Sequence, residues 1–213
     1  MLDFRFFGIP VVVQPFHWVI LGVLGFLNIN PTGRSGLIAV ALFMLAGFIS
    51  ILIHEMGHAL TGRRFGARPE VVLHGMGGVA MFPGGRFTRM QSFLVTAAGP
   101  GIQLILAGLA YAVLVSGVLP DTQITNFFFY LYLVSLFWAV FNCVPVFPLD
   151  GGQMLAAILG ERRAVLTYQI GMGAAILVGI WGLMVGFIFV AFFMGYMAYQ
   201  NYQMMLQHKN HWR

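Results

Sequence analysis

The chain has 213 residues, of which 60% are hydrophobic and only 8% are charged. Soluble domains carry about 25% charged residues, so this composition excludes a water-soluble fold and indicates a polytopic helical membrane protein. The formal net charge of +5 comes from eleven basic residues scattered along the chain, and we therefore expect no nucleic-acid binding.

The N-terminal part of the chain is predicted to contain an extended segment, two spans and a hairpin. Residues 3–14 are β-prone and too short to cross a bilayer, so we expect them at the membrane interface. A first span is expected at about Phe16–Leu27, before the turn-forming residues Asn28–Gly33, and a second from about Leu37 to Arg64. Residues Phe65–Met90 are rich in glycine and β-branched side chains, which predicts a hairpin or re-entrant loop.

Further helical segments are predicted in the rest of the chain. They are a third span at about Gln91–Leu119, a fourth at about Ile124–Phe141, a short helix at Gln153–Leu159 and the apolar stretch Ala164–Leu206. The last stretch is too long for one average span, so we expect two helices that turn near Trp181 and Gly182. One long tilted helix is the alternative.

The predicted fold class is therefore an all-α polytopic membrane protein with about six transmembrane helices. It also includes a small membrane-associated β-hairpin or re-entrant loop. No internal repeat or soluble domain is evident, so we expect a single membrane domain over residues 1–213, with its core catalytic spans at about 37–160.

The positions of the basic residues predict an orientation in the membrane. With six spans, all but one of the eleven lie on the same side; the exception is Arg34. The others are Arg5, Arg63, Arg64, Arg68, Arg86, Arg89, Arg162, Arg163, Lys209 and Arg213. By the positive-inside rule both termini are then cytoplasmic, and we expect a multi-pass protein of a prokaryotic cell membrane.

The sequence His54-Glu55-Met56-Gly57-His58 stands near the C-terminal end of the second predicted span, after seventeen uncharged residues, 37–53. On a helix, residues four apart project from one face, so the two histidines are placed to bind a tetrahedral zinc ion. Glu55 is placed to take a proton from a zinc-bound water. This pattern also occurs by chance, and the alternative is a group of polar side chains packed by hydrogen bonds.

Asp150 is the second carboxylate that is flanked by apolar sequence, in the run Asn142–Gly152 that contains two prolines and two glycines. An ionised carboxylate in hydrocarbon costs several kcal/mol, so it normally faces a partner or a water-filled cavity. A dication held between His54 and His58 would be such a partner, and Asp150 would complete three protein ligands. The prolines and glycines make an unbroken helix through this run unfavourable.

Small residues at Ala97-Ala98-Gly99-Pro100 lie inside the third predicted span. They would let another helix approach closely, and the proline is expected to bend or break the helix.

Together these elements resemble the site-2 protease family of intramembrane zinc metalloproteases. The resemblance covers roughly Ile9 to Gly160. It rests on His54-Glu55-Met56-Gly57-His58-Ala59-Leu60, the Gly77-Gly78 segment, Ala98-Gly99-Pro100, and the sequence from Asn142 through Pro145 to Leu149-Asp150-Gly151-Gly152.

The resemblance implies one zinc ion per chain, with His54, His58 and Asp150 as ligands and Glu55 as the general base. It also implies that Asn142, Gly77 and Gly78 contact the substrate, although Asn142 fits a helix C-terminal cap equally well. Gln103 stands where asparagine is expected, a difference that we expect to leave the metal site unaltered. Many relatives carry a PDZ or CBS domain, and we expect a minimal form without one.

The expected function is zinc-dependent hydrolysis of peptide bonds in or near transmembrane segments of substrate proteins, in the lipid bilayer. A substrate helix must unwind before attack, and the hairpin-like segment Val71–Phe82 offers an edge to which it could add a strand. A regulatory membrane partner is compatible with the sequence, which leaves the oligomeric state open. The alternatives are a metal transporter and an inactive protein that captures membrane segments; Glu55 argues against both.

Overall fold

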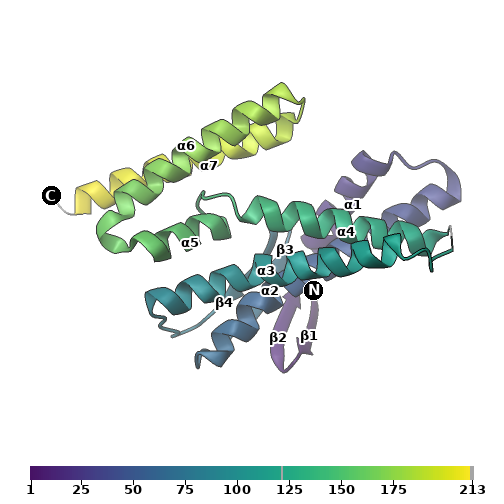
Figure 1. The fold of residues 1–213 in the computed structure, drawn as a ribbon, viewed down its shortest axis with the longest axis horizontal. Coiled ribbons are helices and arrows are strands. Elements are labelled where there is room, and N and C mark those ends of the chain that lie inside the picture. Colours follow the sequence, from purple (N-terminus) through teal and green to yellow (C-terminus); the bar gives the residue numbers. More distant parts are fainter. Residues whose placement is uncertain (121, 212–213) are drawn as a thin grey trace. The chain divides into compact units, whose positions relative to one another are not determined.

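Helices dominate the computed structural model, which describes residues 1–120 and 122–211 (Figure 1). Arg213, which was counted toward the orientation, lies outside the described residues. The elements are, in chain order, β1 (Leu2–Phe6), β2 (Ile9–Val13), α1 (Pro15–Ile29), α2 (Gly33–Arg64), β3 (Glu70–His74), β4 (Gly77–Met81), α3 (Arg89–Val115), α4 (Gln123–Asn142), α5 (Asp150–Leu159), the short 3₁₀ helix η1 (Glu161–Arg163), α6 (Ala164–Met184) and α7 (Ile188–His211).

Four helical segments among the described residues are long and apolar enough to cross a membrane. They are α2, α3, α4 and the segment Glu161–Met184, which contains η1 and α6. α1 is apolar but has only 15 residues, and α7 is a 24-residue helix with a polar C-terminal part. The helical membrane class is therefore confirmed, whereas the predicted count of six spans is not.

Proline and glycine positions explain where the chain leaves the helical conformation, with one exception. α1 ends at Ile29, and its C-cap residue Asn30, just before Pro31, takes the left-handed conformation with φ 46°. The predicted interruption after the fourth span is confirmed, because α4 ends at Asn142 and the next helix begins at Asp150. Pro100 was predicted to bend or break its helix, and the helix is not broken there. α3 continues through Pro100, because proline removes a single donor from a ladder that the flanking residues maintain.

The described chain forms two compact units. Unit 1 contains residues 1–86 and 98–139, and unit 2 contains residues 87–97 and those from 140 onward. Each unit has its own apolar core, and each is described separately below.

Unit 1 contains a four-stranded sheet of order β1-β2-β3-β4. The outer pairs are antiparallel hairpins, whereas β2 and β3 are parallel, with Val11 opposite Val71. The predicted hairpin at Val71–Phe82 is thus confirmed, and the N-terminal segment is extended as expected. The sequence did not predict the pairing of β2 with β3, because that contact joins segments far apart in the chain. Buried side chains of β2 and β3 share one core with Leu52 and Met56 of α2.

Unit 2 contains the helical pair α6 and α7, which lie side by side and are drawn in green and yellow in Figure 1. The predicted pair is confirmed, and the alternative of one long helix is wrong. The turn lies at residues 185–187 rather than near Trp181 and Gly182, because Gly186 provides the positive φ of 82° that reverses the chain. α5 begins at Asp150, three residues before the predicted start at Gln153.

Candidate metal centre

His54 and His58 lie one turn apart on α2, and both side chains are buried. Their Nε2 atoms are 3.1 Å apart, and the two rings are nearly perpendicular at 82°. Two nitrogens bound to one tetrahedral zinc ion at 2.0–2.1 Å would be separated by about 3.3 Å. The pair is therefore arranged as the sequence predicts, and its spacing fits a shared zinc ion.

The side chain of Gln103, on α3, contacts His54 directly. Its Oε1 atom lies 2.9 Å from Nδ1 of His54, and both groups are buried. The Nε2 atom of Gln103 donates to the carbonyl oxygen and to Oγ of Ser50, at 3.3 Å and 2.8 Å. We expected glutamine at position 103 to leave the metal site unaltered, and that stays a prediction. The structure adds that this side chain contacts Nδ1 of the candidate ligand His54.

Close contact between α2 and α3 depends on two glycines. A Cβ atom built at Gly57 would lie 2.5 Å from the carbonyl oxygen of Ala98. A Cβ built at Gly99 would overlap Nε2 of His58, so the α3 backbone passes directly over that ring. The prediction that small residues allow a close helix approach is confirmed here, and the approach occurs at a candidate ligand.

Glu55 is buried beside the two histidines and faces the start of β4. A Cβ built at Gly78 would lie 2.5 Å from Cγ of Glu55 and 2.7 Å from its Oε1 atom. Gly77 has a φ of 123°, a backbone conformation that residues other than glycine rarely adopt. It also packs near the indole of Trp138. The structure thus brings Gly78 to the predicted general base within unit 1.

Asp150 lies at the start of α5 in unit 2, as the first residue of that helix, and is buried. The connector of residues 143–149 folds back over this helix start. A Cβ at Gly151 would overlap the carbonyl oxygens of Cys143 and Val144, and one at Gly152 would lie 2.6 Å from the backbone nitrogen of Phe147. The two glycines after Asp150 therefore allow the connector to pack against the helix that begins with the carboxylate.

Asn201, on α7, also binds this connector, through its side-chain amide. It is completely buried, and its Nδ2 atom donates to the carbonyl oxygen of Phe147 at 2.9 Å and to that of Met197 at 2.8 Å. A Cβ at Gly171 would overlap Oδ1 of Asn201, so α6 closes over this amide. Sequence reasoning missed Asn201, which stands between other polar residues, Gln200 and Gln203, and carries no distinguishing local signal.

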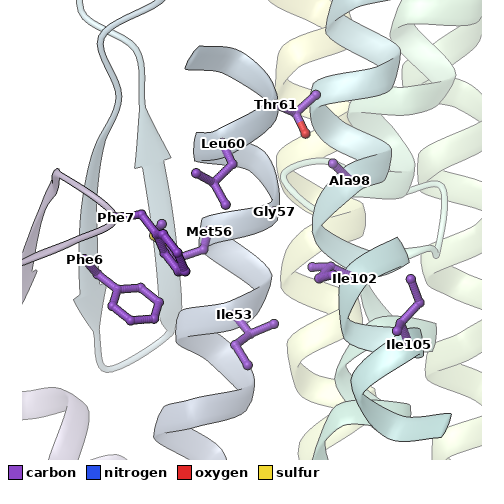
Figure 2. A pocket seen from close by; sticks show the side chains of 10 residues that line it. All are labelled: Phe6, Phe7, Ile53, Met56, Gly57, Leu60, Thr61, Ala98, Ile102 and Ile105. Carbon is purple, nitrogen blue, oxygen red and sulfur yellow. The ribbon is translucent and has the colours of Figure 1, made fainter. Parts of the chain in front are cut away.

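A separate cavity of about 490 Å³ lies in unit 1, and Figure 2 shows its lining. Phe6 and Phe7 lie on one side of α2, and Ile102 and Ile105 of α3 lie on the other. Met56, one of the α2 side chains that line it, points roughly 180° around the helix axis from the midpoint of His54 and His58. It contains no titratable side chain, so we assign the chemistry to the histidine face.

Comparison with known proteins shows which family the chain resembles. The model of peptidase family M50 matches residues 117–186. A zinc metalloprotease of Methanocaldococcus jannaschii is 28% identical over 189 residues, which are 85% of this chain and 53% of that protein. The protein Rip3 of Mycobacterium tuberculosis is 31% identical over 173 residues, which are 75% of this chain and 44% of Rip3.

A solved structure agrees over nearly the whole length. The site-2 protease from Methanocaldococcus jannaschii superposes with a TM-score of 0.66 at 26% identity, and the match covers 94% of each chain. This chain carries a peptidase family M50 domain, the domain of site-2 proteases. It spans about half the length of the curated relatives that it matches.

The structure accounts for some of the predicted site residues better than for others. In unit 1, His54, Glu55 and His58 are buried together, and Gly78 of β4 packs against Glu55. Asn142 is the last residue of α4, as predicted, and its contact with substrate stays a prediction. Ser50 was missed, although it lies four residues before His54 and so shares a helix face with it.

Proposed function

We propose that this protein is a zinc-dependent intramembrane endopeptidase that hydrolyses peptide bonds in or near transmembrane segments of other proteins. The observation that carries the proposal is the 3.1 Å separation of the His54 and His58 Nε2 atoms beside the buried Glu55. The zinc metalloprotease names of the relatives and the apolar helices support it.

The proposed ligand set is His54, His58 and Asp150, with one zinc ion per chain. Two imidazole nitrogens and one carboxylate oxygen are donors that zinc accepts, and three protein ligands leave a fourth position for water. When bound, zinc supplies Lewis acidity and lowers the pKa of its water to about 7. Asp150 begins a helix whose first turn is packed by its own connector, which supports a fixed carboxylate position.

Glu55 is the proposed general base, and it later returns the proton to the leaving amine. Its position against Gly78 places it next to β4, which is an edge strand of the sheet. An edge strand has unpaired backbone groups, so an unwound substrate can add a strand there within reach of Glu55. Gly77, Gly78 and Asn142 are the residues proposed to contact that substrate.

The proposed setting is the cell membrane of a prokaryote, with both termini cytoplasmic. Arg63 and Arg64 occupy the last turn of α2, which suits the helix dipole and the positive-inside rule. Substrates would be membrane-embedded proteins, and a regulatory membrane partner would act by presenting them.

The decisive experiment compares wild type with Glu55→Gln after reconstitution with zinc and a single-span substrate. We expect cleavage by wild type and none by Glu55→Gln, with zinc still bound to both. Glu70→Gln is the matched control, because Glu70 is an exposed carboxylate on β3. Cleavage that survives in Glu55→Gln would refute the assigned mechanism, and zinc movement across the membrane without any cleavage would favour a transporter.

A further inference from the structure

A chain of hydrogen bonds joins three helices of unit 1 behind His54. Gln103 of α3 lies between His54 and Ser50 of α2, and Ser135 of α4 donates through its Oγ to Oγ of Ser50 at 2.9 Å. Ser50, Gln103 and Ser135 are all completely buried. Buried polar groups in an apolar setting must be satisfied by one another, so each link restricts the orientation of the next.

The carbonyl oxygen of Ser50 determines which way the Gln103 amide lies. A carbonyl oxygen only accepts hydrogen bonds, so the amide group that faces it must be the NH₂ group. The amide oxygen of Gln103 then faces Nδ1 of His54, and this oxygen also only accepts. Nδ1 of His54 must therefore carry a proton, which leaves the lone pair of the neutral ring on Nε2.

We propose that Gln103 is a positioning residue that holds His54 in the Nδ1–H tautomer and thereby presents Nε2 as the metal-binding atom. The proposal rests on the zinc site proposed above. Nε2 is the His54 atom that faces Nε2 of His58, so the selected lone pair points at the predicted metal position. Ser50 and Ser135 act indirectly, because their hydrogen bonds fix the orientation of the Gln103 amide.

If Gln103 served only to pack α2 against α3, the orientation of its amide toward Ser50 and His54 would not matter. If Gln103 only filled space between α2 and α3, an apolar side chain of similar volume would leave the His54 tautomer and its metal affinity unchanged. Histidine ligands commonly donate their second N–H to an oxygen, and loss of such a partner typically weakens metal binding roughly 10–100-fold. The two roles therefore predict different outcomes.

The first test is made on the wild-type protein, and a substituted variant serves only to assign the signals. Zinc-free wild-type protein with ¹⁵N-labelled histidine is examined by NMR at a pH where imidazole is neutral, and the His54 signals are assigned with His54→Gln. We expect the proton on Nδ1 of His54; a proton on Nε2 would overturn the proposal. The tautomer is measurable in a protein that cleaves nothing, so this outcome is separate from failure of the proposed protease.

The second test measures zinc affinity by chelator competition in detergent. Gln103→Leu removes the acceptor, and we expect its zinc affinity to fall roughly 10–100-fold. Gln103→Glu restores an acceptor for Nδ1–H, and we expect affinity within a few-fold of wild type. Gln207→Leu, at an exposed glutamine of α7, is the matched control and should bind zinc normally.

Two results of this second test would contradict the proposal. One is wild-type zinc affinity in Gln103→Leu, which would show that the acceptor is not needed. The other is equal weakening in Gln103→Leu and Gln103→Glu, which would show that side-chain shape rather than the acceptor matters. If Gln103→Leu does not fold, the tautomer measurement on wild type still decides the question.

Discussion

Gly78 of β4 lies so close to Glu55 of α2 that a Cβ atom at Gly78 would be 2.5 Å from Cγ of the glutamate. The contact joins the edge strand of the sheet to the proposed general base. It gives a physical reason for the second glycine of the Gly77-Gly78 pair: any larger side chain would displace either the strand or the carboxylate.

Gly78→Ala is expected to reduce cleavage on the order of 100-fold, because a displaced base loses its proton-transfer geometry. Zinc content should be unchanged, since Glu55 is not a proposed ligand. Val79→Ala, at the neighbouring and partly exposed position, is the control and should cleave normally. Full activity in Gly78→Ala would show that the close contact with Glu55 does not matter.

Gly99→Ala is expected to abolish stoichiometric zinc binding, because the new methyl group would overlap Nε2 of His58. Gly101→Ala, two residues along the same helix, is the matched control, because no atom lies within 4 Å of a Cβ built there. Alanine in a helix is otherwise favourable by roughly 0.5–1 kcal/mol relative to glycine. Metal analysis of both purified variants checks the prediction, and equal zinc content would contradict it.

Asn201→Leu is expected to loosen the connector that precedes Asp150, because the hydrogen bond to the Phe147 carbonyl is lost. The free energy of unfolding should fall by about 1–3 kcal/mol, since the partly buried carbonyl of Phe147 loses a donor. Zinc affinity should fall as well if Asp150 is a ligand. Thermal unfolding and chelator competition, each compared with Gln200→Leu on the same helix, measure the two effects. A variant as stable as its control would argue against a role for this amide.

Arg89→Met is expected to destabilise the C-terminal end of α5. Arg89 donates through Nε to the carbonyl oxygen of Ala157 at 3.0 Å and through Nη2 to that of Ile158, so a cation caps the last turn of this helix. Because Arg89 is exposed, the expected loss is only about 1 kcal/mol. Arg86→Met, at an exposed arginine outside α5, serves as the comparison in thermal unfolding. No difference between the two variants would count against the cap.

Much of the local structure was predictable from the sequence. The i, i+4 histidine pair, the interruption between α4 and α5, the hairpin after α2 and the α6–α7 pair were predicted and are confirmed. These features depend on properties of short segments: the length of an apolar run, helical periodicity, and the backbone preferences of glycine and proline.

The contacts that orient the site required the tertiary structure. Gln103 is 49 residues from His54, and its amide could have faced lipid, a backbone carbonyl or a ligand. The sequence showed that a glutamine stood there, but not which groups its amide would contact. The parallel pairing of β2 with β3 and the contact of Gly78 with Glu55 likewise join distant segments.

The sequence by itself thus determined the membrane class, the helical position of His54 and His58 as candidate ligands, and the carboxylate Asp150 as the candidate third ligand. Only the tertiary structure decided which atom of His54 is held by Gln103 and which backbone passes over His58 and Glu55. The physical reason is the distance along the chain over which each effect acts. Hydropathy and helical periodicity act over one or a few turns, whereas hydrogen-bond orientation between helices depends on where packing brings each polar atom.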